Sequence, residues 1–296
     1  MKITITGATG LIGSHLLREL TKYYPDVSAL RRNGATPRIS LERNPNWIEG
    51  QLNDLTENDL KGTDCLIHLA AHGVDPKEAN WEDCFRCNVI ESAELWRRAA
   101  NAGVRNFIIC GSCFEYGATG DSCEYISVDT PLRPTGPYHA SKASATMAAS
   151  ALSTTEKVKV WVLRPFHIYG EGESASRLYP QIVESAKLGR DLDLTEGRQI
   201  RDFMHASDAA RMIHGYALML AEETRIPYFR ISNLGTGKPV SLRDFTATIW
   251  QENCGTGKLK FGAIPYRNAE VMRYVPEIDK AEQGAAANAL SRVAEL

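Results

Sequence analysis

Three glycines at positions 7, 10 and 13 follow a short strand-like segment, residues 2–6, near the N-terminus. Glycines let the backbone turn tightly and approach a ligand closely, and the helix expected from about Gly10 to Tyr23 offers free N–H groups at its positive end. A strand, a glycine-rich turn and a helix in this order are typical of the first unit of a dinucleotide-binding sheet. We expect phosphate contacts from Gly7, Thr9, Gly10, Leu11, Ile12 and Gly13.

Strand-like and helix-like segments alternate through the first 170 residues. Strands are expected at residues 2–6, 26–30, 46–49, 64–69, 106–110 and 157–163, with a long helix over 81–102 and another that carries Tyr138 and Lys142. Such alternation predicts a parallel sheet covered by helices on both faces. The elements become shorter after Gly170. We therefore predict an α/β protein: a Rossmann-type, doubly wound parallel sheet forms an NADP-binding domain over residues 1–170. A smaller α/β substrate-binding domain follows over 171–296, with part of 199–233 returning to the first domain.

Composition excludes several classes of protein. The chain has 296 residues, 43% of them hydrophobic, and a formal net charge of −2, which does not suit a general nucleic-acid or anionic-membrane binder. No apolar run approaches the ~20 residues that span a bilayer, and the first residues are too polar for a signal peptide. The seven cysteines predict a reduced, cytoplasmic protein. The Cys84–Cys87 and Cys110–Cys113 spacings lack further ligands, so we expect no metal site.

The choice of cofactor should depend on the end of the second strand. An acidic residue there would bind the adenosine ribose hydroxyls and favour NAD, whereas a cation accommodates the 2′-phosphate of NADP. The sequence has Arg31 and Arg32 at this point and no acid. This favours NADP over NAD. Asp54, followed by Leu55, is a candidate for the adenine edge, and it could equally cap the next helix.

Tyr138 and Lys142 are four residues apart, so on a helix they share one face. A lysine ammonium beside a phenol favours the phenolate and lowers the tyrosine pKa. A tyrosine tuned in this way can exchange a proton with a substrate oxygen. The pair predicts carbonyl–alcohol redox chemistry at the nicotinamide end of the bound dinucleotide.

The chain resembles the extended short-chain dehydrogenase/reductase family, the NAD(P)-dependent sugar epimerases and dehydratases. The likeness covers nearly the whole length and includes the glycine loop, Tyr138 and Lys142, His68-Leu69-Ala70-Ala71, Asn88, Ser112 before Tyr116-Gly117, Leu163-Arg164-Pro165, Ile168-Tyr169-Gly170, Arg201-Asp202-Phe203 and Asn233-Leu234-Gly235-Thr236-Gly237. The resemblance implies that Ser112 hydrogen-bonds the reacting substrate oxygen and that Asn88 supports Lys142 through a water. It also implies cofactor contacts from Leu69, Ala70, Ala71, Pro165 and Ile168.

The resemblance also bears on the type of reaction. Dehydratases of this family carry acidic residues directly after the Ser/Thr, where this chain has Cys113 and Phe114, and Glu115 comes one place too late and is expected to be structural. His167 stands where many epimerases have asparagine. Sequences around 195–203 and 261–267 resemble the nucleotide-sugar 4-ketoreductases of the CDP-abequose and paratose synthase type and of the dTDP-4-keto-6-deoxyhexose reductase type. Substrate contacts are expected from His72, Cys113, Phe114, His167, Arg177, Arg201 and Arg267, the arginines at the diphosphate.

Taken together, these features predict an NADPH-dependent 4-ketoreductase of a nucleotide-linked 4-keto-6-deoxyhexose. Tyr138 would donate the proton, Lys142 would tune it and Ser112 would polarise the carbonyl. Two alternatives stay open: a nucleotide-sugar 4-epimerase with the same three residues, and a non-catalytic NADP-binding sensor. The expected partner is a nucleotide-diphosphate sugar. The resemblance also implies a homodimer, formed through the long helix and the Tyr138 helix.

Overall fold

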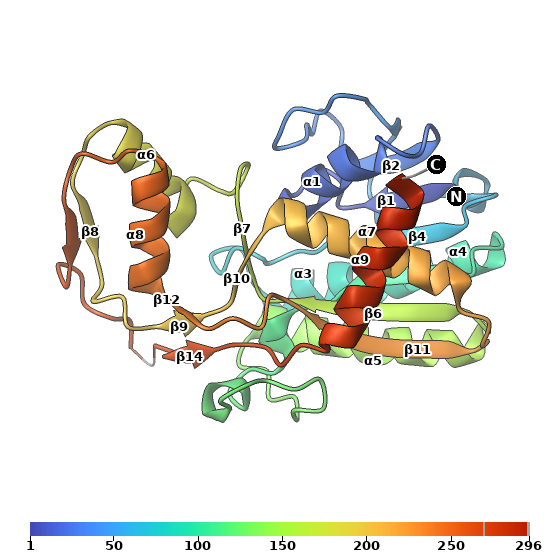
Figure 1. Ribbon diagram of the computed structural model, residues 1–296. Coiled ribbons are helices and arrows are strands. Elements are labelled where there is room, and N and C mark those ends of the chain that lie inside the picture. The colour runs from blue at the N-terminus through green and yellow to red at the C-terminus, as the bar shows by residue number, and fades with distance from the viewer. Residues whose placement is uncertain (269, 295–296) are drawn as a thin grey trace.

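A computed structural model describes residues 1–268 and 270–294, and its central feature is a seven-stranded sheet with the order β11-β6-β5-β4-β1-β2-β3 (Figure 1). All neighbouring strands are parallel. The strands are β1 (Ile3–Thr6), β2 (Val27–Arg31), β3 (Asn46–Glu49), β4 (Cys65–His68), β5 (Asn106–Cys110), β6 (Lys159–Pro165) and β11 (Tyr228–Leu234). The predicted α/β class and Rossmann-type sheet are confirmed. Because β1 lies between β2 and β4, the chain reverses direction across the sheet at the glycine loop.

Helices cover both faces of this sheet. One face carries α1 (Leu11–Leu20), α7 (Ala206–Glu222) and α9 (Lys280–Ala294), and the other carries α2 (Glu57–Leu60), α4 (Ser92–Asn101) and α5 (Pro137–Thr155). The domain prediction assigns only part of 199–233 to the first domain; in the structure α9 also packs on α7, with its buried Ala286 against Gly215 (Figure 1). None of the helices in 1–268 and 270–294 is both long and apolar enough to cross a bilayer.

The helix predicted over 81–102 is continuous but changes its winding. It consists of α3 (Trp81–Phe85), a π-helical turn η2 (Arg86–Glu91) and then α4. The π turn contains Asn88, whose side-chain amide donates to the His72 carbonyl oxygen and to Ser141 Oγ. Single π turns within helices often occur at functional sites. This turn directs Asn88 between the loop after β4 and α5.

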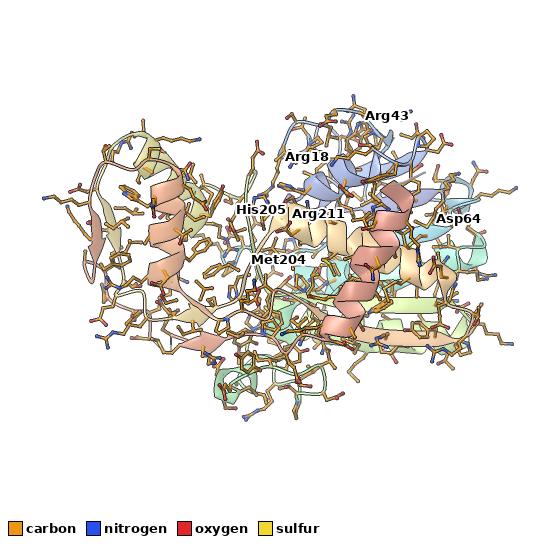
Figure 2. The ribbon with its side chains drawn as sticks, in the orientation of Figure 1. Arg18, Arg43, Asp64, Met204, His205 and Arg211 are labelled. Atoms are coloured by element: carbon orange, nitrogen blue, oxygen red, sulfur yellow. The ribbon has the colours of Figure 1, made fainter. Side chains whose placement is uncertain are left out.

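The smaller lobe has its own core and lies to the left in Figure 1. It contains α6 (Leu178–Lys187), α8 (Leu242–Glu252), the parallel pair β8 (Leu192–Leu194) and β13 (Leu259–Phe261), and the short strands β9 (Ile200–Arg201), β12 (Val240–Ser241) and β14 (Arg273–Tyr274). A further parallel pair, β7 (His167–Tyr169) with β10 (Phe203–His205), connects the lobes, and Met204 and His205 lie at this junction (Figure 2).

A buried ion pair joins the elements that end near the Tyr138 helix. Glu115, in the 3₁₀ turn η3 (Cys113–Glu115), is completely buried, and its Oε2 accepts a hydrogen bond of 2.9 Å from Arg164 Nε in β6. Thr146 of α5 donates to the same oxygen, and the Ser112 N–H donates to Oε1. Every partner is a donor, which matches an ionised carboxylate. Glu115 is therefore structural, as expected from its position.

Close packing at the start of α1 leaves no room for a side chain at Gly13. A Cβ there would overlap the Gly7 carbonyl oxygen, whereas a Cβ at Gly284, on the exposed side of α9, meets nothing within 4 Å. Overpacking a closely packed site costs about 1–3 kcal/mol, and Gly-to-Ala in an exposed helix interior is worth roughly 0.5–1 kcal/mol in stability.

We predict that Gly13→Ala lowers the free energy of unfolding by about 1–3 kcal/mol, while Gly284→Ala leaves it unchanged or raises it. Urea denaturation followed by circular dichroism measures both. Equal effects of the two substitutions would contradict the packing of Gly13 against Gly7.

Candidate functional site

The candidate site begins where the loops after β1 and β4 meet. Gly7 has φ +69°, and a Cβ on it would lie 2.5 Å from the Ala70 backbone nitrogen, so only glycine allows this approach. The helix α1 that follows has Gly10 as its N-cap, with no side-chain cap and no acidic residue in its first turn. Its first N–H groups and positive dipole end are therefore available to an anion. This cradle fits the phosphates of a dinucleotide.

The two arginines predicted to determine the cofactor preference, Arg31 and Arg32, have different surroundings in the structure. Arg31 Nε donates to Glu49 Oε1 at 2.7 Å, and the Arg31 guanidinium lies 4.6 Å above the Trp47 ring. Sequence reasoning missed Glu49, although the parallel register places it directly beside Arg31 at the ends of β2 and β3. Arg32 is exposed, and no ion pair or hydrogen bond of its side chain is found within the described residues. Arg32 is thus the cation of this pair that can meet a phosphate.

Asp54 and Leu55 lie in and directly after the short turn that follows β3. Asp54 Oδ2 accepts a hydrogen bond of 2.8 Å from the Gln51 N–H and caps the 3₁₀ turn η1 (Leu52–Asp54). Asp54 thus caps its own turn, whereas the next helix, α2, is capped by Thr56, and an adenine contact from Asp54 stays a prediction. Leu55 is completely buried in the core that also contains Leu95 and Trp96 of α4.

Ser112, Tyr138 and Lys142 come together at the carboxyl end of β5. Ser112 is the N-cap of η3, and its Oγ accepts a hydrogen bond from the Phe114 N–H. Tyr138 is the second residue of α5, whose N-terminus is set by Gly136 and Pro137, and its phenol lies near Ser112. Lys142 lies one helical turn later and its Nζ donates to the Cys110 carbonyl oxygen. Two hydroxyls and one ammonium group are therefore gathered beside the loop that follows β5.

Burial is the main influence on the pKa of Tyr138. It raises this pKa well above its usual value, and the neighbouring Ser112 opposes this only in part. The Lys142 ammonium donates to the Cys110 carbonyl oxygen, and its expected lowering of the tyrosine pKa stays a prediction. At neutral pH Tyr138 is protonated and can act as a proton donor.

Asn88 links the loop after β4 to α5. Its Oδ1 accepts from the His72 N–H at 2.7 Å, and its Nδ2 donates to the His72 carbonyl oxygen and to Ser141 Oγ. Ser141 in turn donates to the Tyr138 carbonyl oxygen. Asn88 is therefore linked to the backbone of the tyrosine helix through the Ser141 hydroxyl, and its expected support of Lys142 through a water stays a prediction.

A basic group lies on the other side of the site, toward the smaller lobe. Burial, together with the charges of the nearby Arg201 and Arg177, lowers the pKa of His167 to about 3. His167 Nδ1 is buried and has no partner in the described part of the chain. Arg201 pairs with Glu270 at 3.4 Å, and Arg177 donates to the Val74 carbonyl oxygen. A diphosphate binding here would compete with these contacts.

Two other predicted substrate residues stand apart from this basic group. Arg267 is exposed on the loop after β13, and no described contact joins its side chain to His167 or Arg201. His72 is tied to Asn88 through its backbone, and its ring hydrogen-bonds to the Glu78 carbonyl oxygen at 3.1 Å. His72 thus belongs to the loop after β4, where Asn88 holds its backbone.

An aromatic pair at the site went unrecognised in the sequence. His139, directly after Tyr138, stacks on Phe114 with ring centroids 5.0 Å apart and 11° between the planes. Its Nδ1 also lies 3.0 Å from Thr135 Oγ1. Adjacency to Tyr138 was the signal available, but the partner Phe114 could not be inferred from spacing.

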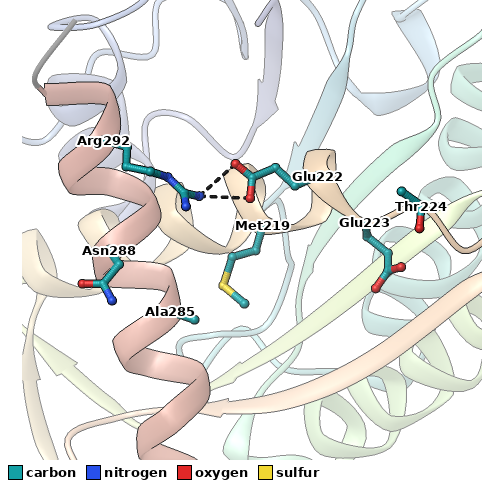
Figure 3. A pocket seen from close by; sticks show the side chains of 7 residues that line it. All are labelled: Met219, Glu222, Glu223, Thr224, Ala285, Asn288 and Arg292. Carbon is teal, nitrogen blue, oxygen red and sulfur yellow. Dashed lines mark hydrogen bonds and ion pairs between the residues drawn. The ribbon is translucent and has the colours of Figure 1, made fainter.

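The molecule also has a cavity of about 430 Å³ far from these residues, between α7 and α9 (Figure 3). Its lining includes Met219, Asn288 and the ion pair between Glu222 and Arg292, with an N–O distance of 2.9 Å. None of the residues predicted for the site lines this cavity, so it is separate from the candidate site.

Comparisons with known proteins identify the family of the chain. A family model described as "NAD dependent epimerase/dehydratase family" matches residues 3–235. The chain is 26% identical over 273 residues to CDP-abequose synthase of Salmonella muenchen, covering 92% of this chain and 87% of that one. It is also 26% identical over 265 residues to UDP-glucose 4-epimerase of Corynebacterium glutamicum, covering 82% and 78%.

Among solved structures, MoeE5 in complex with UDP-glucuronic acid and NAD superimposes with a TM-score of 0.77 at 28% identity, covering 97% of this chain and 92% of that one. The resemblance drawn from the sequence is confirmed. Since the family model spans most of the chain, the protein belongs to the NAD dependent epimerase/dehydratase family.

Proposed function

We propose that this protein is an NADPH-dependent 4-ketoreductase that acts on a nucleotide-linked 4-keto-6-deoxyhexose. The observation that carries the proposal is the meeting of Ser112, Tyr138 and Lys142 at the end of β5, next to a phosphate cradle at α1. Relatives named as a CDP-abequose synthase and a dTDP-6-deoxy-L-talose 4-dehydrogenase (NAD(+)) support a nucleotide sugar as the substrate.

Each residue of the candidate site has a separate part in the proposed reduction. The bound nicotinamide supplies the hydride. Tyr138, whose raised pKa keeps it protonated at neutral pH, gives its proton to the C4 oxygen of the sugar, and Ser112 hydrogen-bonds the same oxygen. Arg201, Arg177 and the neutral His167 bind the diphosphate. Cys113 and Phe114 occupy the positions after Ser112, and neither can act as the carboxylate that a dehydration needs.

A 4-epimerase is the second candidate, because the same three residues serve that reaction and a UDP-glucose 4-epimerase is among the relatives. The cofactor separates the two. A reductase exchanges NADPH with solution, whereas an epimerase regenerates its cofactor in each cycle.

The deciding experiment follows absorbance at 340 nm with CDP- and dTDP-4-keto-6-deoxyglucose, using NADPH and NADH in parallel. Stoichiometric oxidation that prefers NADPH supports the reductase. Absence of oxidation, together with NAD released from the denatured protein, would replace the reductase by the epimerase.

We predict that Tyr138→Phe lowers kcat by roughly 10²–10⁴-fold, the usual contribution of a positioned proton donor. The dissociation constant for NADPH should stay within about threefold, since the phenol touches the reacting oxygen and not the phosphates. Tyr125→Phe, on an exposed loop, is the matched control and should leave kcat unchanged. Full turnover by Tyr138→Phe would show that Tyr138 is not the proton donor. If the variant has no turnover but keeps its function in the cell, a non-catalytic NADP-binding sensor would be favoured over an enzyme.

We predict that Arg32→Ala raises the dissociation constant for NADPH by roughly 10–100-fold, because one charge-assisted hydrogen bond is worth about 1.5–3 kcal/mol. The value for NADH, which lacks the 2′-phosphate, should not change. Arg43→Ala, on an exposed arginine of the same connection (Figure 2), is the control. Fluorescence titration with both cofactors measures this, and equal weakening of the two would refute NADP selection by Arg32.

We further propose a homodimer formed through α3, η2 and α5, which lie against one another. Trp81, Ile90 and Met147 on these elements are 62%, 55% and 71% exposed, an apolar surface expected to be covered by a second copy. We predict a solution mass of about twice 32.7 kDa by light scattering, and half of that for Met147→Glu. Leu188→Glu, at an exposed residue of the smaller lobe, should stay dimeric. A monomeric wild-type protein would contradict the proposal.

A further inference from the structure

A stacked pair of rings lies beside the hydroxyls of the candidate site. The rings of Phe114 and His139 are stacked nearly parallel, with centroids 5.0 Å apart, and the Phe114 side chain is 43% exposed although it is a large apolar group. The His139 ring is fixed from the other side by Thr135 Oγ1. An exposed phenyl ring held in place in this way presents a rigid apolar surface to whatever binds next to it.

The chain places this surface next to the reacting atoms. Phe114 belongs to the same turn as Ser112 and donates its N–H to Ser112 Oγ, while His139 follows Tyr138 directly on α5. The two elements that supply the hydroxyls of Ser112 and Tyr138 therefore also supply the two stacked rings. A substrate whose oxygen lies between the hydroxyls has a neighbouring substituent within reach of the Phe114 ring.

Three polar side chains near the ring, those of Cys113, Glu115 and Tyr274, are buried or already hydrogen-bonded. The Cys113 side chain is 3% exposed, and both carboxylate oxygens of Glu115 are already bonded within the core. The Tyr274 ring, 6.4 Å from Phe114, uses its hydroxyl to donate to the Cys113 carbonyl oxygen. A hydroxyl placed against the Phe114 ring would lose hydrogen bonds to water that the ring cannot replace, which costs about 1–3 kcal/mol in proteins.

We propose that Phe114, positioned by His139, is a specificity-determining residue that selects sugars with a methyl group beside the reacting carbon over sugars with a hydroxymethyl group. This inference rests on the proposed function, because it assumes that a sugar C4 oxygen binds between Ser112 and Tyr138. It assigns the preference for 6-deoxy sugars to one ring, and it makes His139 a positioning residue for that ring.

The test compares two stable alcohols with the same nucleotide, a nucleotide-linked 6-deoxyhexose and the corresponding hexose. Their oxidation with NADP⁺ is followed at 340 nm, and their dissociation constants are measured by calorimetry. For the wild-type protein we expect kcat/KM to favour the 6-deoxy sugar by roughly 10–100-fold, within the range that a single buried hydroxyl provides. Phe114→Asn should reduce this ratio to about threefold or less, mainly by losing efficiency with the 6-deoxy sugar.

Three further variants distinguish packing from selectivity. Phe114→Leu keeps an apolar surface and should retain most of the ratio, His139→Ala frees the ring and should give an intermediate ratio, and Tyr125→Asn, at an aromatic residue of similar exposure (42%), should leave the ratio unchanged. A wild-type ratio near one, or an unchanged ratio in Phe114→Asn, would overturn the inference even if the protein is a reductase. If neither sugar is oxidised, the proposed function fails, and the calorimetric ratio alone supports or overturns the role of Phe114.

Discussion

The ion pair between Glu115 and Arg164 joins the parts of the molecule on which the candidate site depends. Both side chains are buried, so their charges are tolerated only because each has partners. Glu115 accepts from Ser112, Thr146 and Arg164, and Arg164 also donates to the Tyr116 hydroxyl. Removing one partner of such a pair typically costs about 3–5 kcal/mol, since an unpaired charge stays in the core. The turn after β5, the strand β6 and the helix α5 are thereby held in one arrangement.

The network extends beyond the pair to the edge of the sheet. The Tyr116 hydroxyl donates to Asn233 Oδ1 in β11 at 2.6 Å, and Asn233 Nδ2 donates to the Ile126 and Glu277 carbonyl oxygens. A strand late in the sequence is in this way tied to the turn that contains Ser112. The same turn carries the exposed Phe114. The buried Glu115–Arg164 pair therefore fixes the position of both the Ser112 hydroxyl and the Phe114 ring.

At the ends of β2 and β3, where the cofactor preference is expected to be determined, an ion pair decides which arginine is available. At the ends of β2 and β3, Glu49 neutralises Arg31, and the Trp47 ring lies under the guanidinium. An acid that could serve a ribose is present after all, but on the neighbouring strand and already paired. The free cation at this point is therefore Arg32. Two adjacent arginines that look equivalent along the chain have different roles in space, because alternate residues at a strand end point in opposite directions.

Local sequence determined the parts of this protein that depend on short-range geometry. The glycines around α1, the alternation of strands and helices and the four-residue spacing of Tyr138 and Lys142 each specify backbone conformation over a few residues, and from them the sheet and the catalytic helix were predictable. Tertiary structure decided what depends on burial and on partners distant in sequence. Burial raises the pKa of Tyr138, an effect that the spacing of Tyr138 and Lys142 does not encode. The pairing of Arg31 with Glu49, the stacking of Phe114 on His139 and the return of α9 to the sheet join residues whose proximity no local pattern encodes.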